Sequence, residues 1–312
     1  MTVLIAADFD ADEWAGWTAA LQAAMPGEQL VRSLADVAPD SIDIALVANP
    51  PTGALQGLAR LQLIQSLWAG VDKLLADPSV PAGVPLARMV DPAMNQAMAE
   101  TALWAVLSLH RGGIDYAAQQ REARWQPHPQ RRADEVTVAV LGLGQMGRTV
   151  ANRLVRNGYR VLGWSASRPV TLDGVDVRAG DATLPDVLAQ AEIVVNLLPL
   201  TPTTRGLFNA TTLMQMPRGA SLVNLARGGH VVDADLLAAL ACGHLHHAVL
   251  DVFHTEPLPA QHAFWSHPQV TVLPHVAAST DPRSAALVVA RNVRALREGR
   301  PVEHLVDRTR GY

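Results

Sequence analysis

The stretch Val136–Gly147 decides the fold of this chain: Val-Thr-Val-Ala-Val-Leu is followed directly by Gly-Leu-Gly-Gln-Met-Gly. The first six residues are typical of a buried strand, and residues 146–157 are typical of a helix. In this strand–turn–helix context, the glycine spacing predicts a turn that binds the pyrophosphate of a dinucleotide. Gly142 allows a tight turn, Gly144 lets a phosphate approach the backbone, and Gly147 allows close helix–strand packing. An ordinary strand-to-helix turn is the alternative.

Strand and helix patterns alternate on both sides of this stretch, which indicates parallel sheets covered by helices. After it we expect helices to separate five further strands, at 160–164, 193–197, 221–225, 246–252 and 270–273. Before it we expect strands at 3–6, 42–47 and 61–67, a helix at 10–25, and a long helix that begins at Asp91-Pro92. A last helix is expected over 282–298. The fold class predicted is α/β, with two doubly wound parallel-sheet domains.

Composition limits what kind of protein this is. The chain has 312 residues, 49% of them hydrophobic, so it can form two full cores and is not disordered. A net charge of −4 gives no basic excess for nucleic acid or for a membrane surface. No apolar run reaches the roughly 20 residues of a membrane span, and no secretory signal is expected. The single cysteine, Cys242, predicts a reducing compartment, which we take to be the cytoplasm.

The choice of dinucleotide depends on the end of the second strand, where a carboxylate binds the ribose hydroxyls of NAD. No carboxylate stands there, because the sequence reads Gly163-Trp-Ser-Ala-Ser-Arg168. The hydroxyls of Ser165 and Ser167 and the guanidinium of Arg168 can bind a 2′-phosphate, which a carboxylate would repel. The cofactor predicted is NADP(H), with NAD(H) possible. The alternative is that Arg168 is a solvated loop residue.

Three polar residues follow the ends of separate strands, at the edge of a parallel sheet where ligands bind. They are Arg227, Glu256 and His275. A guanidinium can bind the carboxylate of a 2-oxo acid, and a histidine can deliver a proton near neutral pH. A glutamate beside that histidine would orient it and stabilise its protonated form. Together with a hydride donor, this set predicts reduction of a ketone to an alcohol.

These residues lie in strings that resemble the D-isomer specific 2-hydroxyacid dehydrogenase family. The strings follow the family's order and are specific when taken together. The C-terminal residues 306–312 and the Trp-Ser-x-Ser-Arg string are similar to the glyoxylate/hydroxypyruvate reductase A branch of that family. The strings are Gly142–Gly147, Leu198–Thr204, Asn224–Gly229, Leu250–Phe253 with Glu256–Pro259, and Leu273–Ala278.

The resemblance implies an architecture in which a Rossmann NADP-binding domain, residues 99–282, is inserted into a flavodoxin-like substrate domain, residues 1–98 and 283–312. It implies a homodimer whose arm lies near 99–132. It assigns substrate binding to Arg227, acid/base chemistry to His275 and support of His275 to Glu256. It also implies that backbone amides near Trp68, Ala69, Gly70 and Val71 bind the substrate carboxylate. The cofactor residues that it implies are Gly142, Gly144, Gln145, Met146, Gly147, Ser165, Ser167, Arg168, Pro199, Thr204, Ala226 and Asp251.

The function predicted is an NADPH-preferring reductase of small 2-oxo acids, which converts glyoxylate to glycolate and hydroxypyruvate to glycerate. The bulk of Trp68 favours a small substrate. Another dehydrogenase of the same fold is one alternative, and a nucleotide-sensing scaffold is another. No metal site is predicted, because His246 and His247 alternate along a strand and point to opposite faces.

Overall fold

The protein is described here by a computed structural model that covers residues 2–166 and 170–311. The chain divides into two compact units, one formed by Met1–Met94 with Thr280–Tyr312 and the other by Asn95–Ser279. The first division falls just inside helix α3 (Pro92–His110), and the second lies just before helix α9 (Pro282–Arg297). The sequence placed these divisions slightly later, at 98/99 and 282/283.

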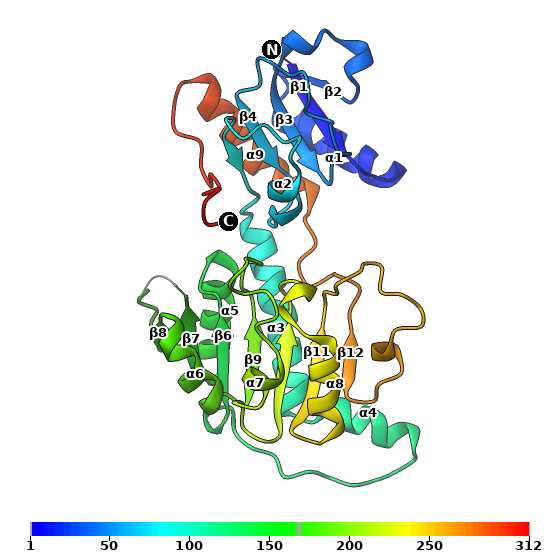
Figure 1. Ribbon diagram of the computed structural model, residues 1–312, viewed down its shortest axis with the longest axis vertical. Helices are drawn as coiled ribbons and strands as arrows, with labels where there is room; N and C mark the ends of the chain where they lie inside the picture. Colours follow the sequence, from blue (N-terminus) through cyan, green and yellow to red (C-terminus); the bar gives the residue numbers. More distant parts are fainter. Residues whose placement is uncertain (1, 167–169, 312) are drawn as a thin grey trace. The chain divides into compact units, whose positions relative to one another are not determined.

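The second unit is built on a seven-stranded parallel sheet in the order β12-β11-β10-β9-β6-β7-β8 (Figure 1). From β8 to β11 this is the 3-2-1-4-5-6 order of a dinucleotide-binding sheet, with β12 added beyond its sixth strand. The strands are β6 (Thr137–Leu141), β7 (Arg160–Ser165), β8 (Val175–Ala179), β9 (Ile193–Asn196), β10 (Ala220–Asn224), β11 (Leu245–Leu250) and β12 (Val270–Val272).

Both faces of this sheet are buried, because side chains of alternate residues point to opposite faces. Ala139 and Leu141 of β6 belong to one core, whereas Val138 and Val140 belong to the other. Helices α6 (Leu184–Gln190), α7 (Ala210–Leu213) and α8 (Asp233–Ala241) cover the first core. Helices α3 and α5 (Gln145–Arg156) cover the second (Figure 1). Such two-sided burial explains why the strands are continuous apolar runs.

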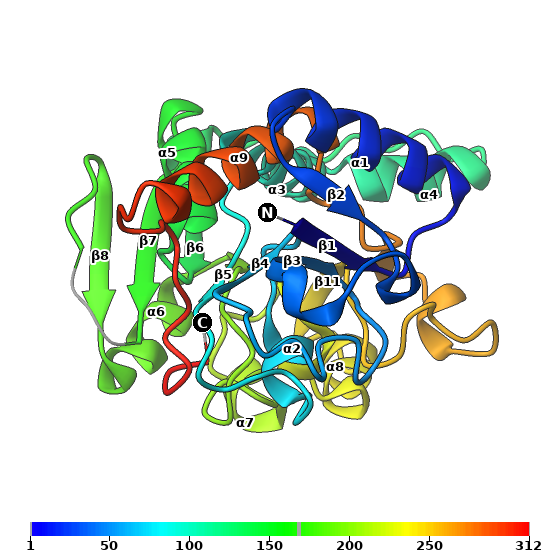
Figure 2. The same cartoon turned by 90° about the horizontal axis from the view of Figure 1, so that it is seen from above.

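The first unit contains a five-stranded parallel sheet in the order β2-β1-β3-β4-β5, which is the flavodoxin-like order. Helices α1 (Ala11–Ala24) and α9 pack together on one face of it (Figure 2). Leu74 of the short helix α2 (Asp72–Ala76) joins the core on the other face. The strands are β1 (Thr2–Ala7), β2 (Gln29–Val31), β3 (Ile42–Ala48), β4 (Leu63–Ser66) and β5 (Leu86–Ala87). The predicted α/β class with two doubly wound parallel sheets is confirmed.

The sequence missed the elements that carry little apolar signal. Strand β8 was not expected because it is an edge strand whose polar residues Asp176 and Arg178 alternate with half-buried ones. Strands β2 and β5 have only three and two residues. The long helix that begins at Pro92 is interrupted, since α3 ends at His110 and α4 (Gly113–Arg121) follows Gly112, which has a φ of 68°.

Asp233 and Thr183 stand just before apolar helical patterns, which predicts that each caps a helix, but the two caps differ in the structure. Asp233 is the first residue of α8 and Val232 occupies the cap position, whereas Thr183 caps α6 without a side-chain hydrogen bond. Asp281 does cap α9, because its carboxylate accepts a hydrogen bond from the Arg283 amide at 2.9 Å. Within residues 2–166 and 170–311, we find no helix with the length and apolar character that crossing a bilayer requires.

Candidate active site

The glycine turn between β6 and α5 has the shape that a pyrophosphate requires. Gly142 has a φ of 97°, and a Cβ there would lie 2.8 Å from the carbonyl oxygen of Leu197. A Cβ on Gly147 would lie 1.8 Å from the carbonyl oxygen of Gly142, so only glycine fits. A Cβ on Gly144, by contrast, would meet nothing within 4 Å. The backbone of Gly144 is therefore open to a ligand at the helix N-terminus, where the first residues of α5, Gln145 and Met146, provide amide groups.

The site predicted for the 2′-phosphate is only partly described. Ser165 is the last residue of β7 and is half-buried, and its carbonyl oxygen accepts a hydrogen bond from the Gly180 amide at 2.9 Å. Ser167 and Arg168 lie outside the described residues. The roles given to these three residues remain predictions.

The loop after β9 contains two more of the predicted cofactor residues. The Thr204 hydroxyl donates a hydrogen bond to the carbonyl oxygen of Pro199 at 2.7 Å and accepts one from the Thr201 amide at 2.9 Å. Thr204 is also buried. Its side chain therefore holds the loop in shape, and the backbone of Pro199 is fixed by that contact.

His275 and Glu256 form a direct pair. The Nδ1 atom of His275 lies 2.8 Å from Oε2 of Glu256. The other carboxylate oxygen, Oε1, accepts a hydrogen bond from the Phe253 amide at 2.9 Å, which fixes the direction of the carboxylate. A carboxylate accepts hydrogen bonds, so Nδ1 carries a proton and Nε2 is the ring atom that can exchange one with a substrate. About half of the His275 side chain is exposed, so a ligand can reach it.

The backbone at His275 is held in an unusual conformation. Its φ is 57°, in the left-handed region that non-glycine residues seldom adopt. Asp251, which directly follows β11, accepts hydrogen bonds from the amides of Val276 at 2.7 Å and Ala277 at 3.0 Å. The Thr101 hydroxyl donates to the carbonyl oxygen of Ala277 at 2.8 Å. These contacts fix the turn that carries His275.

Asp251 is almost completely buried, and this burial raises the pKa of its carboxyl group. The two backbone amides favour the charged carboxylate and act against that shift. The family resemblance assigns Asp251 to the cofactor. The structure adds a contact that the sequence did not indicate, because both carboxylate oxygens bind the turn after His275.

The Arg227 turn follows β10 and packs tightly against the segment that carries Glu256. A Cβ on Gly228 would lie 2.0 Å from the backbone carbonyl carbon of Phe253, so the two backbone segments are in close contact. The Nη1 atom of Arg227 donates to the carbonyl oxygen of Ala226 at 2.7 Å. Because β10, β11 and β12 are parallel neighbours, Arg227, Glu256 and His275 all follow the carboxyl edge of one sheet.

The predicted substrate loop lies in the first unit, after β4. The Ser66 hydroxyl donates to the carbonyl oxygen of Trp68 at 2.9 Å and accepts from the Trp68 amide at 3.1 Å, which closes a tight turn. The indole of Trp68 makes edge contacts with Phe9 and Trp17, with ring centres 6.1 Å apart in both pairs. Ala69 and Gly70 follow, half-buried, and Val71 is buried. The structure therefore places the Trp68 ring in an aromatic cluster.

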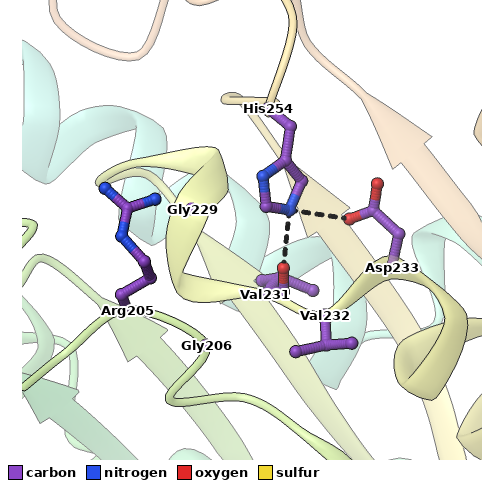
Figure 3. A pocket seen from close by; sticks show the side chains of 7 residues that line it. All are labelled: Arg205, Gly206, Gly229, Val231, Val232, Asp233 and His254. Carbon is purple, nitrogen blue, oxygen red and sulfur yellow. Dashed lines mark hydrogen bonds and ion pairs between the residues drawn. The ribbon is translucent and has the colours of Figure 1, made fainter. Parts of the chain in front are cut away.

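A cavity of about 400 Å³ lies beside the segment that follows the Arg227 turn (Figure 3). His254 lines one side of it, and its Nε2 atom donates a hydrogen bond to the carbonyl oxygen of Val231 at 2.8 Å. The same atom lies 3.6 Å from the carboxylate of Asp233. Arg205 lines another side of the cavity. None of the residues that line it was predicted from the sequence to belong to a functional site.

Sequence reasoning also missed three polar side chains at the same sheet edge. Asn196 and Asn224 are the last residues of β9 and β10, and His230 ends the short turn after Arg227. All three are completely buried. The available signal was an asparagine at the end of each of two neighbouring apolar strands.

The family model described as "D-isomer specific 2-hydroxyacid dehydrogenase, NAD binding domain" matches residues 103–277. A glyoxylate/hydroxypyruvate reductase A from Klebsiella pneumoniae (strain 342) is 42% identical over 301 residues, which are 95% of this chain and 96% of that protein.

Two solved structures are similar to the whole chain. A D-isomer specific 2-hydroxyacid dehydrogenase from Xanthobacter autotrophicus Py2, in complex with NADPH and MES, is 42% identical with a TM-score of 0.95, covering 100% of this chain and 99% of its own. An NADPH-dependent glyoxylate/hydroxypyruvate reductase from Sinorhizobium meliloti, in complex with NADP and sulfate, is 35% identical with a TM-score of 0.92 and the same coverage. The family indicated by the sequence motifs is confirmed.

Proposed function

Because the chain belongs to the D-isomer specific 2-hydroxyacid dehydrogenase family, we propose that it reduces small 2-oxo acids with NADPH, converting glyoxylate to glycolate and hydroxypyruvate to glycerate. The observation that carries this proposal is the 2.8 Å contact between His275 and Glu256, whose segment packs against the Arg227 turn at Gly228. An acid, its supporting carboxylate and a guanidinium are the groups that ketone reduction needs.

Each residue of this set has a separate task. The guanidinium of Arg227 binds the substrate carboxylate and polarises the adjacent carbonyl. The Glu256 carboxylate orients the ring of His275 and stabilises it when doubly protonated. Nε2 of His275 then donates its proton to the carbonyl oxygen as that oxygen gains negative charge. When bound, the reduced nicotinamide supplies the hydride that adds to the carbonyl carbon. The backbone amides of Ala69, Gly70 and Val71 remain our proposal for further contacts to the substrate carboxylate.

The cofactor is held by its phosphates in this proposal. The open backbone of Gly144 and the N-terminus of α5 fit a pyrophosphate. Ser165, Ser167 and Arg168 would bind the 2′-phosphate, which makes NADPH the preferred cofactor and leaves NADH usable. The complexes of the two solved relatives with NADPH and NADP support this assignment.

The assembly and location of the protein are part of the same proposal. We place it in the cytoplasm as a homodimer that uses the arm near 99–132. Residues 121–132 are all exposed, and the side chain of Trp125 is 97% exposed, which supports a contact surface on this segment. Light scattering tests the dimer, and a monomer at all concentrations would contradict it.

Initial rates with NADPH and NADH, each with glyoxylate and with hydroxypyruvate, test the function. We expect turnover of both acids with NADPH and slower turnover with NADH. Turnover with NADH alone would contradict the assignment of the 2′-phosphate site. Binding of nucleotide without turnover of either acid would contradict the substrate assignment and favour another 2-oxo acid or a nucleotide-sensing scaffold.

A single substitution tests the predicted preference for NADPH over NADH. Arg168→Asp should weaken binding of NADPH much more than binding of NADH, because a carboxylate repels the 2′-phosphate. The matched control is Arg160→Asp, because Arg160 is the exposed first residue of β7. If Arg168→Asp lost affinity for NADPH and for NADH equally, the predicted contact of this arginine with the 2′-phosphate would be contradicted.

A further inference from the structure

Three polar side chains of the second unit are buried completely and have no part in the chemistry described above. They are Asn196, Asn224 and His230, each with an exposed fraction of 0%. Burial of polar groups is costly unless they are hydrogen-bonded. Their partners therefore show what this cluster achieves.

The orientation of the Asn196 amide follows from its backbone partner. The Leu198 amide approaches Oδ1 of Asn196 at 3.2 Å, and a backbone N–H can only donate. The Nδ2 atom must then face the other way, where it donates to Oδ1 of Asn224 and to Nδ1 of His230, both at 3.0 Å. The two asparagines are direct partners in the register of β9 and β10.

The ring of His230 extends this network to the cofactor loop. Its Nδ1 atom accepts from Asn196, so this nitrogen carries no proton. Its Nε2 atom lies 3.2 Å from the carbonyl oxygen of Pro199, which can only accept, so Nε2 carries the proton. The ring is thus neutral and joins the end of β9 to the loop after it.

Asn224 extends the network to the substrate-binding turn. Its Oδ1 atom accepts from the Ala226 amide at 3.3 Å, and its Nδ2 atom donates to the carbonyl oxygen of Arg227 at 3.0 Å. One connected set of hydrogen bonds therefore fixes the backbone of two loops. Both loops follow neighbouring strands and hold groups assigned above to the cofactor and the substrate.

We propose that Asn196, Asn224 and His230 form a buried clamp that holds the Pro199 loop and the Arg227 turn in one fixed arrangement. The three residues are positioning residues: they touch neither reactant and act through the backbone of these loops. The inference rests on the proposed function, because the loops matter to the reaction only if they bind cofactor and substrate. A clamp of this kind makes the two binding loops move as one unit.

His230 is the residue to vary, because it lies outside the strands. His230→Phe keeps a planar ring but removes the hydrogen bonds to Pro199 and to Asn196. Loss of a buried hydrogen bond is expected to lower kcat/KM for glyoxylate at least about tenfold and to raise the Kd for NADPH by a similar factor. His230→Gln places an amide nitrogen where Nε2 was, so it can still donate to the Pro199 carbonyl. We expect it to recover much of the NADPH affinity.

The matched control is His244→Phe. His244 is also a buried histidine of this unit, and its Nε2 atom binds a backbone carbonyl, that of Leu213, at 3.1 Å. It precedes β11, at the opposite end of the strands from the clamp. His244→Phe should lower the Tm as much as His230→Phe does, while kcat/KM and the Kd for NADPH stay within twofold of the unmodified protein.

The outcomes separate positioning from general stability. A selective loss in His230→Phe with recovery in His230→Gln supports the clamp. Unchanged kinetics and Kd in a folded His230→Phe, or equal losses in both phenylalanine variants, would overturn it. If His230→Phe does not fold, His230→Asn takes its place, because an asparagine can accept from Asn196 but cannot reach Pro199. The clamp then requires weaker NADPH binding in His230→Asn than in His230→Gln, and equal binding would overturn it.

The readout with NADPH alone keeps this inference distinct from the proposed function. The Kd is measured by fluorescence of the bound nucleotide and needs no turnover. If the unmodified protein reduces neither glyoxylate nor hydroxypyruvate, the proposed function fails, whereas the effect of His230 on nucleotide binding still decides whether the clamp acts on the cofactor loop.

Discussion

Replacing Asp251 with asparagine perturbs the turn that carries His275 while it keeps the size of the side chain. Asp251 accepts from two backbone amides, at 2.7 and 3.0 Å, with a different carboxylate oxygen for each. Asparagine has one carbonyl oxygen, so one amide would face an NH₂ group and lose its partner. The left-handed backbone of His275, which costs about 1–3 kcal/mol, would lose part of what holds it.

The size of the effect follows from the bond that is lost. A hydrogen bond to a charged group contributes about 1.5–3 kcal/mol. If about 2 kcal/mol of this energy serves to orient His275 in the transition state, its loss lowers kcat about thirtyfold. Because the family resemblance also assigns Asp251 to the cofactor, kcat is measured at saturating NADPH, where the loss reports on the turn that carries His275.

The assay is kcat for glyoxylate reduction at saturating NADPH, together with the Kd for NADPH measured by fluorescence. Asp176→Asn is the control, because it removes the same charge from an exposed position on β8. A kcat of Asp251→Asn within twofold of the unmodified protein would show that these two hydrogen bonds do not position His275. A raised Kd with unchanged kcat would show that Asp251 serves the cofactor, as the family resemblance implies.

Three further predictions concern the phosphate turn and the stability of each unit. Gly144→Ala should keep the Tm of the unmodified protein but bind NADPH more weakly, because the methyl group fills the open space beside the backbone. Gly147→Ala should also have a lower Tm, because its methyl group would clash with the backbone. Equal Tm values for the two variants would contradict this. Arg297→Met leaves the carboxylates of Glu28 and Asp43, both largely buried in the first unit, without their cation. The free energy of unfolding, measured with urea, should therefore fall by about 3–5 kcal/mol. A change under about 1 kcal/mol would contradict this prediction. Burial, reinforced by the neighbouring histidine, lowers the pKa of His247 to about 4, so the unfolded chain binds more protons between pH 6.5 and 4. Stability should therefore fall by up to about 3 kcal/mol as the pH drops through this window, and His247→Asn should lose most of that slope.

The parts of the fold that were predictable are those with a strong local pattern. Continuous apolar runs identified the central strands, and Asp10 with Glu13 at the start of α1 forms the reciprocal cap that marks a helix. Strand β8, at one edge of its sheet, was missed because alternate side chains face solvent and the apolar pattern disappears, whereas β12 at the other edge was predicted. Short strands add too few residues to be recognised.

The candidate site was predictable where residues follow strands, because parallel topology brings strand ends to one edge. This is why Arg227, Glu256 and His275 could be grouped without a structure. The supporting contacts could not be predicted, because they join distant positions: Asp251 binds the backbone of residues 276 and 277, and His230 binds that of Pro199. Nothing in the local sequence distinguishes such a buried polar residue from one in an ordinary loop.

The proposed reaction depends on His275 as the proton donor. The most direct test is kcat for NADPH-dependent glyoxylate reduction by His275→Gln, measured beside the Kd for NADPH. We predict a fall in kcat of at least about a hundredfold, since a positioned general acid contributes that much, with the Kd within threefold of the unmodified protein. Turnover within twofold of the unmodified protein would contradict it.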